Sequence, residues 1–123
     1  MFSLSNILKI NAISSGLTGL QLVIFSNFAA GLFAVDTQVP FRITGIFLIV
    51  FALFVIHQAY QKPISPKQVV HIIWIDRLWV LASVLSVPLL YNTISVTGLV
   101  LIVAIAAWVA LMAYAQNYKL IRL

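Results

Sequence analysis

The chain contains no cysteine and no glutamate, and its only acidic residues are Asp36 and Asp76. Without cysteine the protein has no disulfide, no thiolate nucleophile and no cysteine ligand for a metal ion. Charged residues make up only 7% of the 123 residues, whereas a soluble domain averages roughly a quarter. The sequence therefore lacks most of the groups that keep a folded domain dissolved in water.

Apolar residues dominate instead: 63% of the chain is hydrophobic and the mean hydropathy is +1.14. A soluble chain this short could not hide so much apolar surface, because small domains bury a smaller fraction of their surface. We therefore expect lipid to be the solvent of most side chains. The net charge of +5 comes from single basic residues near the ends of apolar runs. This spacing argues against nucleic acid as a partner and favours contact with membrane lipids.

Four apolar runs approach the length of about 20 residues that a helix needs to cross a bilayer. We predict an all-α single domain, residues 1–123, folded as an antiparallel up-down four-helix transmembrane bundle. Pro40 is tolerated in the first turn of a helix, Pro63 ends the second helix and Pro66 opens the third. Residues 27–34 are too short to span and should form an interfacial segment between the first two helices. The predicted helices cover about residues 5–25, 38–60, 66–90 and 94–118.

Lysine and arginine are distributed unevenly between the two sides of this topology. The side that holds the connection between the first two helices and the turn between the last two has only Arg42, which lies near Asp36. Because basic residues concentrate in cytoplasmic segments of membrane proteins, we expect the N-terminus, the loop 61–68 and the C-terminus of a multi-pass protein to be cytoplasmic. The basic residues on the expected cytoplasmic side are Lys9, Lys62, Lys67, Lys119 and Arg122.

The first helix has two distinct faces. Polar residues recur on one stripe at helical spacing, and bulky apolar residues occupy the opposite stripe. In a bilayer, small and polar residues mark the face that contacts other helices, so we expect the polar stripe inside the bundle. Ser15 and Gly19 also form a small-xxx-small pair that allows another helix to approach closely. The polar stripe is Asn11, Ser14, Ser15, Thr18 and Gln21, and the apolar stripe is Ile13, Leu17, Leu20 and Ile24.

Asp76 and Arg77 stand inside the third predicted helix. Asp76 lies about 10 Å along the helix from Val69, where the apolar stretch begins, at a rise of 1.5 Å per residue. A charged side chain at the centre of a bilayer costs about 2.5–3.5 kcal/mol on insertion scales. Arg77 is an ion-pair candidate and can also extend its long side chain toward the headgroups. Asp76 is too short for that and needs a polar partner inside the bundle.

Counting residues along the helices places several polar side chains at the depth of Asp76. The predicted cluster consists of Asp76, His57, Asn11, Ser15 and Gln116 on the cytoplasmic half of the bundle. Such a cluster is typical of a site that binds a proton, a cation or another ligand. It is also typical of a hydrogen-bond network that fixes how helices pack. Both interpretations stay open at this stage.

The histidines invite a haem hypothesis, since His57 and His71 fall at similar depth on neighbouring helices, as paired axial ligands would. His71 points away from Asp76, toward the side of Trp74, and fits an interfacial position in an aromatic belt better. We therefore expect no haem b and no other cofactor. One carboxylate and two histidines are too few for a zinc site, and no metal site is predicted. No pairing of nucleophile and base emerges, so the sequence does not indicate an enzyme.

The length and four-helix plan are similar to those of small multidrug resistance transporters, but their membrane-embedded glutamate has no counterpart in this chain. A second resemblance rests on several short motifs: Asn11 with Ser14-Ser15-Gly16-x-x-Gly19, Arg42-x-x-Gly45, and Asp76 with Trp79-Val80 and Ser83. In these motifs the sequence resembles uncharacterised small bacterial four-helix inner-membrane proteins of a broadly DoxX-like kind. This resemblance implies a multi-pass protein of the bacterial inner membrane and supplies no activity.

From these features we expect a small integral membrane protein that is not an enzyme and acts within the bilayer as a binding or accessory subunit. Its expected partners are membrane lipids and either another membrane protein or a second copy of the chain. The alternative is a small transporter or proton-coupled carrier in which Asp76 is the coupling carboxylate. A single bundle of this size has little room for a pathway, so the alternative requires a dimer.

Overall fold

The computed structural model describes residues 3–121, and within that range the regular structure is entirely helical. Four of the five helices are long and apolar enough to cross a membrane. The all-α bundle predicted from the sequence is therefore confirmed, while Arg122, which the charge count included, lies outside the described residues. The helices are α1 (Leu4–Ile24), α2 (Ser26–Phe33), α3 (Val39–Ala59), α4 (Pro66–Leu90) and α5 (Val96–Ile121).

Local sequence explains where several of the helices begin and end. The side chain of Ser3 caps α1 by accepting a hydrogen bond from the backbone N–H of Asn6 at 3.2 Å. Pro40 and Pro66 lie in the first turns of α3 and α4, where the missing N–H costs no helical hydrogen bond. The end of α2 is marked by Ala34, which adopts the left-handed conformation with φ of 58°. Residues 27–34, expected at the membrane interface, thus lie almost entirely in α2.

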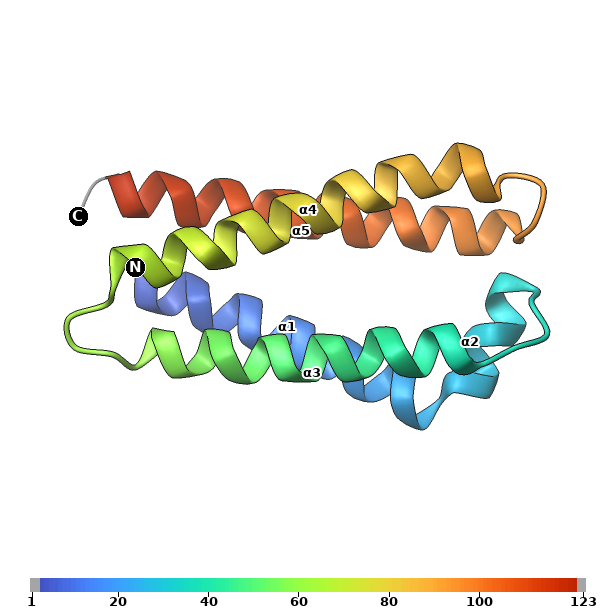
Figure 1. Ribbon diagram of the computed structural model, residues 1–123, viewed down its shortest axis with the longest axis horizontal. Helices are drawn as coiled ribbons and strands as arrows, with labels where there is room; N and C mark the ends of the chain where they lie inside the picture. The colour runs from blue at the N-terminus through green and yellow to red at the C-terminus, as the bar shows by residue number, and fades with distance from the viewer. Residues whose placement is uncertain (1–2, 122–123) are drawn as a thin grey trace.

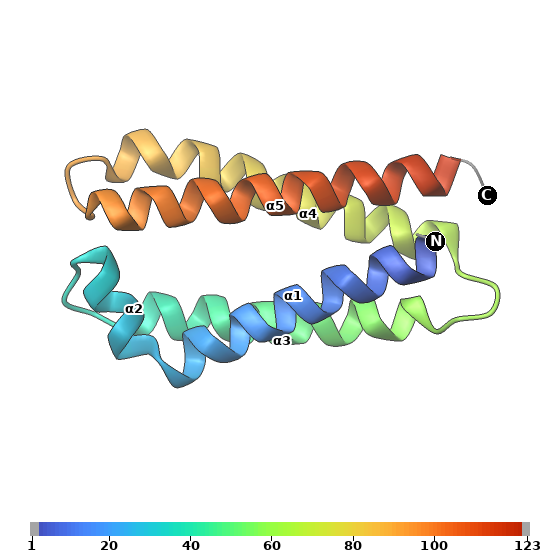
Figure 2. The same cartoon turned by 180° about the vertical axis from the view of Figure 1, so that it is seen from behind.

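The long helices form two layers, with α1 beside α3 in one layer and α4 beside α5 in the other (Figures 1 and 2). Figure 1 also shows the loop 60–65 at the same end of the bundle as the two chain ends. The short helix α2 and the turn 91–95 lie at the opposite end. The structure therefore brings together three of the segments in which the sequence concentrates its basic residues.

Helices α1 and α3 approach so closely that their glycines touch backbone to backbone. A Cβ atom built on Gly19 would lie 2.7 Å from the carbonyl oxygen of Gly45, and a Cβ on Gly45 would lie 2.6 Å from that of Gly19. Both distances are too short for a real carbon atom. The absence of a side chain at these two positions is therefore what allows α1 and α3 to pack as one unit.

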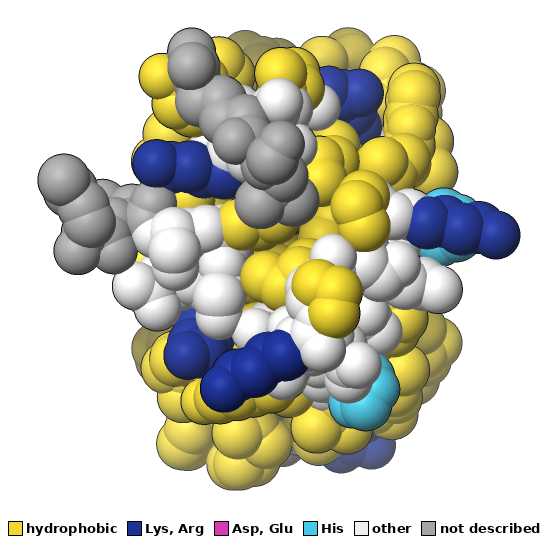
Figure 3. Space-filling view, turned by 90° about the vertical axis from the view of Figure 1, so that its left-hand side faces the viewer, with side chains coloured by type: hydrophobic (Ala, Val, Ile, Leu, Met, Phe, Trp, Pro, Cys, Tyr) yellow, Lys and Arg dark blue, Asp and Glu magenta, His cyan; other side chains and the backbone are white. Residues whose placement is uncertain are grey.

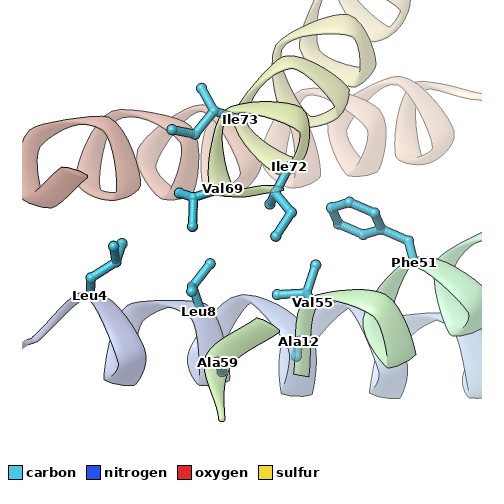
Figure 4. Packing of buried hydrophobic residues seen from close by; sticks show 9 residues of the cluster. All are labelled: Leu4, Leu8, Ala12, Phe51, Val55, Ala59, Val69, Ile72 and Ile73. Carbon is cyan, nitrogen blue, oxygen red and sulfur yellow. The ribbon is translucent and has the colours of Figure 1, made fainter. Parts of the chain in front are cut away.

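The two layers are joined mainly near the end that holds the loop 60–65. There, apolar side chains of α1 and α3 face those of α4 across a buried cluster (Figure 4). At the opposite end α2 contacts α5, where Phe33 lies against Gly98 and the Ser95 hydroxyl donates to the Leu32 carbonyl. The members of the cluster are Leu4, Leu8, Ala12, Phe51, Val55, Ala59, Val69, Ile72 and Ile73.

Large apolar side chains cover the outside of the bundle. All four residues of the predicted lipid-facing stripe of α1 are exposed, from Leu20 at 47% to Ile24 at 66%. In water this surface would be a severe aggregation hazard, but in a bilayer it is the surface that acyl chains solvate. The chain is a multi-pass helical membrane protein.

Candidate functional site

Three polar side chains meet inside the bundle, each supplied by a different long helix. Asn11 comes from α1, Asp76 from α4 and Gln116 from α5, and they are 2%, 3% and 0% exposed. Their depths agree because α1, α4 and α5 all carry these residues toward the end that holds the loop 60–65 (Figure 1). We refer to Asn11, Asp76 and Gln116 as the polar triad.

The triad forms a closed ring of hydrogen bonds. The Asp76 Oδ2 atom accepts from the Asn11 amide at 3.1 Å and from the Gln116 amide at 2.9 Å. The same Asn11 nitrogen donates a second bond to the Gln116 Oε1 atom at 2.8 Å. Both protons of the Asn11 amide are thereby used, and one carboxylate oxygen receives two donors. Amide donors are the partners that an anionic carboxylate needs where water is absent.

Serine residues of α1 extend this polar region toward its neighbours. The Ser15 hydroxyl donates to Asn11 Oδ1 at 3.3 Å and so helps to fix the orientation of that amide. Ser14, one turn from Asn11, accepts a hydrogen bond from the indole N–H of Trp108 at 3.1 Å, and this bond links α1 to α5 a second time. Of the five residues in the predicted cluster, Asn11, Ser15, Asp76 and Gln116 are therefore connected.

The fifth, His57, does not join them. It is exposed on α3, and its Nε2 atom lies 3.2 Å from the side-chain nitrogen of Gln61, near the loop 60–65. His71 is likewise exposed, on α4, with its Nδ1 atom 3.2 Å from Gln68 Oε1. Within residues 3–121 no group of three histidine, cysteine, aspartate or glutamate side chains is placed to hold a metal ion.

Arg77 lies next to the triad in sequence but faces away from it. Its guanidinium lies over the ring of Trp74, with the carbon 5.2 Å from the ring centroid, and both residues are exposed. Within residues 3–121 it forms no ion pair with Asp76, whose Oδ2 atom is engaged by Asn11 and Gln116. Adjacent residues of a helix are separated by about 100°, so Arg77 cannot fully share the inward direction that Asp76 takes.

The contact between α3 and α4 contributes aromatic stacking rather than polar bonding. Trp79 stacks on Phe47 with ring centroids 6.2 Å apart and ring planes 7° from parallel. Its indole Nε1 atom is buried and has no hydrogen-bond partner within the described part of the chain. The sequence analysis predicted neither the unpaired Nε1 atom of Trp79 nor the absence of an α3 residue from the triad.

The geometry gives the triad two chemical capacities. It ties α1 to the α4–α5 layer through directional hydrogen bonds, which favour one relative rotation of these helices. It also places the one carboxylate of the spanning helices where a proton could bind it. In either case the protein's fold and site define a class: a helical, multi-pass membrane protein with a buried polar triad inside its bundle.

No family model matches the chain, and comparisons with curated proteins and with solved structures give no match.

Proposed function

We propose that this protein is a non-enzymatic subunit of a bacterial inner membrane that binds a partner protein or a lipophilic molecule within the bilayer. The size of its connections supports this proposal. The longest element outside the spanning helices is the eight-residue α2, and the loop between α3 and α4 covers residues 60–65. These segments are too short to form a soluble module, so a partner would be met mainly through the spanning helices.

The observation that carries the proposal is that the triad's polar groups bond to one another. Asp76 is held by both amides, and the Asn11 amide uses both of its protons within the triad. A network closed in this way serves to hold helices together. The binding surface is then the lipid-facing exterior, which exposes a large set of apolar side chains.

A groove on that exterior suits an apolar occupant. It lies along the contact between α4 and α5, encloses about 240 Å³ and is lined by aliphatic side chains and one serine. A hydrocarbon chain, or bulky apolar side chains of a partner helix, would fit this groove. Such an occupant has no polar group from which water must be removed. The lining residues are Val80, Ser83, Val84, Val87, Ile102, Val103, Ala106, Ala107 and Ala110.

We expect extraction of the tagged protein in a mild detergent, followed by mass spectrometry, to recover one reproducible membrane-protein companion or one bound lipophilic molecule. Replacing Ala107 in the groove by Phe should reduce recovery several-fold, because the ring would fill the space that the occupant needs. The matched control is Leu111→Phe, an exposed position one turn further along α5 and outside the groove. A protein that is consistently recovered alone would contradict the proposal.

The second candidate is a small transporter or proton-coupled carrier that works as a dimer and uses Asp76. It is favoured by one observation, the burial of a carboxylate among three spanning helices. The proposed orientation, with the loop 61–68 and both chain ends cytoplasmic, would place this carboxylate nearer the cytoplasmic surface.

Asp76→Asn separates the two candidates, because the new amide oxygen can still accept both hydrogen bonds although it cannot release a proton. For a proton-coupled carrier we expect pH-driven flux in wild-type proteoliposomes and none with Asp76→Asn, while thermal stability in detergent changes little. Asp36→Asn, which changes the other aspartate at an exposed position, should leave the flux intact. Absence of flux in the wild type under every pH gradient would exclude the carrier.

A further inference from the structure

The exposed face of α4 carries positive charge that no group within residues 3–121 neutralises. Lys67, His71 and Trp74 follow one another at spacings of four and three residues, and Arg77 comes three residues later. Residues at these spacings share one side of a helix. All four are exposed. We call Lys67, His71, Trp74 and Arg77 the basic face of α4.

Arg77 is the member of this face that most needs a counter-ion. It lies about 12 Å along α4 from Val69, at 1.5 Å per residue, inside a helix long and apolar enough to span a membrane. Within residues 3–121 it has no ion pair. Of the chain's two acids, Asp76 is turned into the triad, and Asp36 lies in the connection between α2 and α3 at the opposite end. The counter-ion must therefore come from outside these residues.

The side-chain arrangement shows from which direction that counter-ion comes. The guanidinium lies over Trp74, one turn closer to the start of α4, so Arg77 extends toward the end that holds the loop 60–65. Side chains that extend in this way carry their charge to the headgroup level. Figure 3 views that end of the bundle and shows Lys, Arg and His side chains around its rim, with no acidic side chain visible.

Apolar residues continue the same face beyond Arg77. Leu78 and Leu81 are 59% and 54% exposed and lie on this side of α4. A molecule that fits the whole face would have an anionic group near Lys67 and Arg77 and hydrocarbon along the leucines. A phospholipid has that order of groups along the bilayer normal, whereas a free phosphate has only the first.

We propose that the basic face of α4 binds the headgroup of an anionic phospholipid, with its phosphate between Arg77 and Lys67 and its acyl chains along Leu78 and Leu81. The planar guanidinium can donate two parallel hydrogen bonds to phosphate oxygens. His71 is held on this face by its contact with Gln68 and lies beside the headgroup. The bound lipid supplies the counter-ion that residues 3–121 do not.

The test is native mass spectrometry of the full chain in a neutral detergent with added phosphatidylglycerol, phosphatidylcholine or inorganic phosphate. We expect phosphatidylglycerol to be retained selectively by the wild type. Each basic residue near an anionic surface contributes about 1 kcal/mol, which corresponds to a factor of about five in affinity. Arg77→Gln should therefore weaken retention about fivefold or more, and Arg77→Lys should restore part of it.

Lys9→Gln is the matched control, since Lys9 is also basic and also lies over an aromatic ring, 4.5 Å from the centroid of Tyr60, but belongs to the other layer. It should retain phosphatidylglycerol as the wild type does. If Arg77→Gln does not fold, Lys67→Gln at the exposed start of α4 decides the question with the same expected loss. Three results would each overturn the proposal. Lys9→Gln could lose as much phosphatidylglycerol as the α4 variants do. The wild type could retain phosphatidylcholine equally well, or inorganic phosphate could displace phosphatidylglycerol completely.

Discussion

Asp76→Leu is expected to lower the free energy of unfolding in detergent by about 2 kcal/mol. The change removes the oxygen that accepts from both Asn11 and Gln116. A buried donor left without a partner costs about 1–3 kcal/mol. Hydrogen bonds between helices in a membrane contribute less than this on average, about 0.6 kcal/mol each. Leucine also removes the cost of burying a carboxylate. The net loss of stability therefore stays below the summed cost of two unpaired donors. Thermal or denaturant unfolding followed by circular dichroism measures it.

Two further variants identify the triad as the cause of that loss. Asp76→Asn keeps an acceptor in place and should lose well under 1 kcal/mol. Replacing all three triad residues by leucine leaves no amide of the triad without a hydrogen-bond partner. Exchange of all partners for apolar groups can be nearly neutral. The triple variant should therefore be more stable than Asp76→Leu alone. A triple variant that is markedly less stable than the single one would contradict the role assigned to the triad.

Gly45→Ala is expected to cost about 1–2 kcal/mol net, because overpacking opposes a gain of about 1 kcal/mol from alanine as the better helix former. The new Cβ would lie 2.6 Å from the Gly19 carbonyl oxygen and 2.8 Å from Val23 Cγ2. The first of these is backbone, which no change of side-chain rotamer can relieve, so α1 and α3 must move apart. Overpacking of this kind typically costs 1–3 kcal/mol. The same unfolding measurement applies.

Gly16→Ala is the matched control on α1, because its Cβ would lie 3.4 Å from Ala52 Cβ, an ordinary contact distance. It should leave stability unchanged or raise it by up to about 1 kcal/mol, as the better helix propensity of alanine allows. Equal effects of Gly16→Ala and Gly45→Ala would show that loss of glycine flexibility, and not the contact between backbones, is what matters.

The two sets of variants act on different interfaces between helices. Gly45 controls the pairing of α1 with α3 within one layer, whereas the triad joins α1 to the other layer. Because the sites share no side-chain contact, their effects should add within about 0.5 kcal/mol.

The depth of the polar residues could be predicted from the sequence. Helix rise is fixed, so counting from the loop 61–68 and from the chain ends placed Asn11, Ser15, Asp76 and Gln116 at one level, and the structure connects these four. The same count placed His57 near that level as well, but His57 is exposed and bonded toward the loop. Depth alone could not separate the two cases, because it does not state the direction in which a side chain points.

Composition and run length thus determined that this is a helical protein of the membrane, since about 20 apolar residues and almost no charge leave no other solvent. The tertiary structure alone decided which helices pair, that Gly45 faces Gly19, that three amide and carboxylate groups close a ring, and that Arg77 turns outward to Trp74. The physical reason lies in the solvent. Lipid is as apolar as the bundle interior, so the hydrophobic pattern cannot mark the inward face, and only close packing and hydrogen bonds select it.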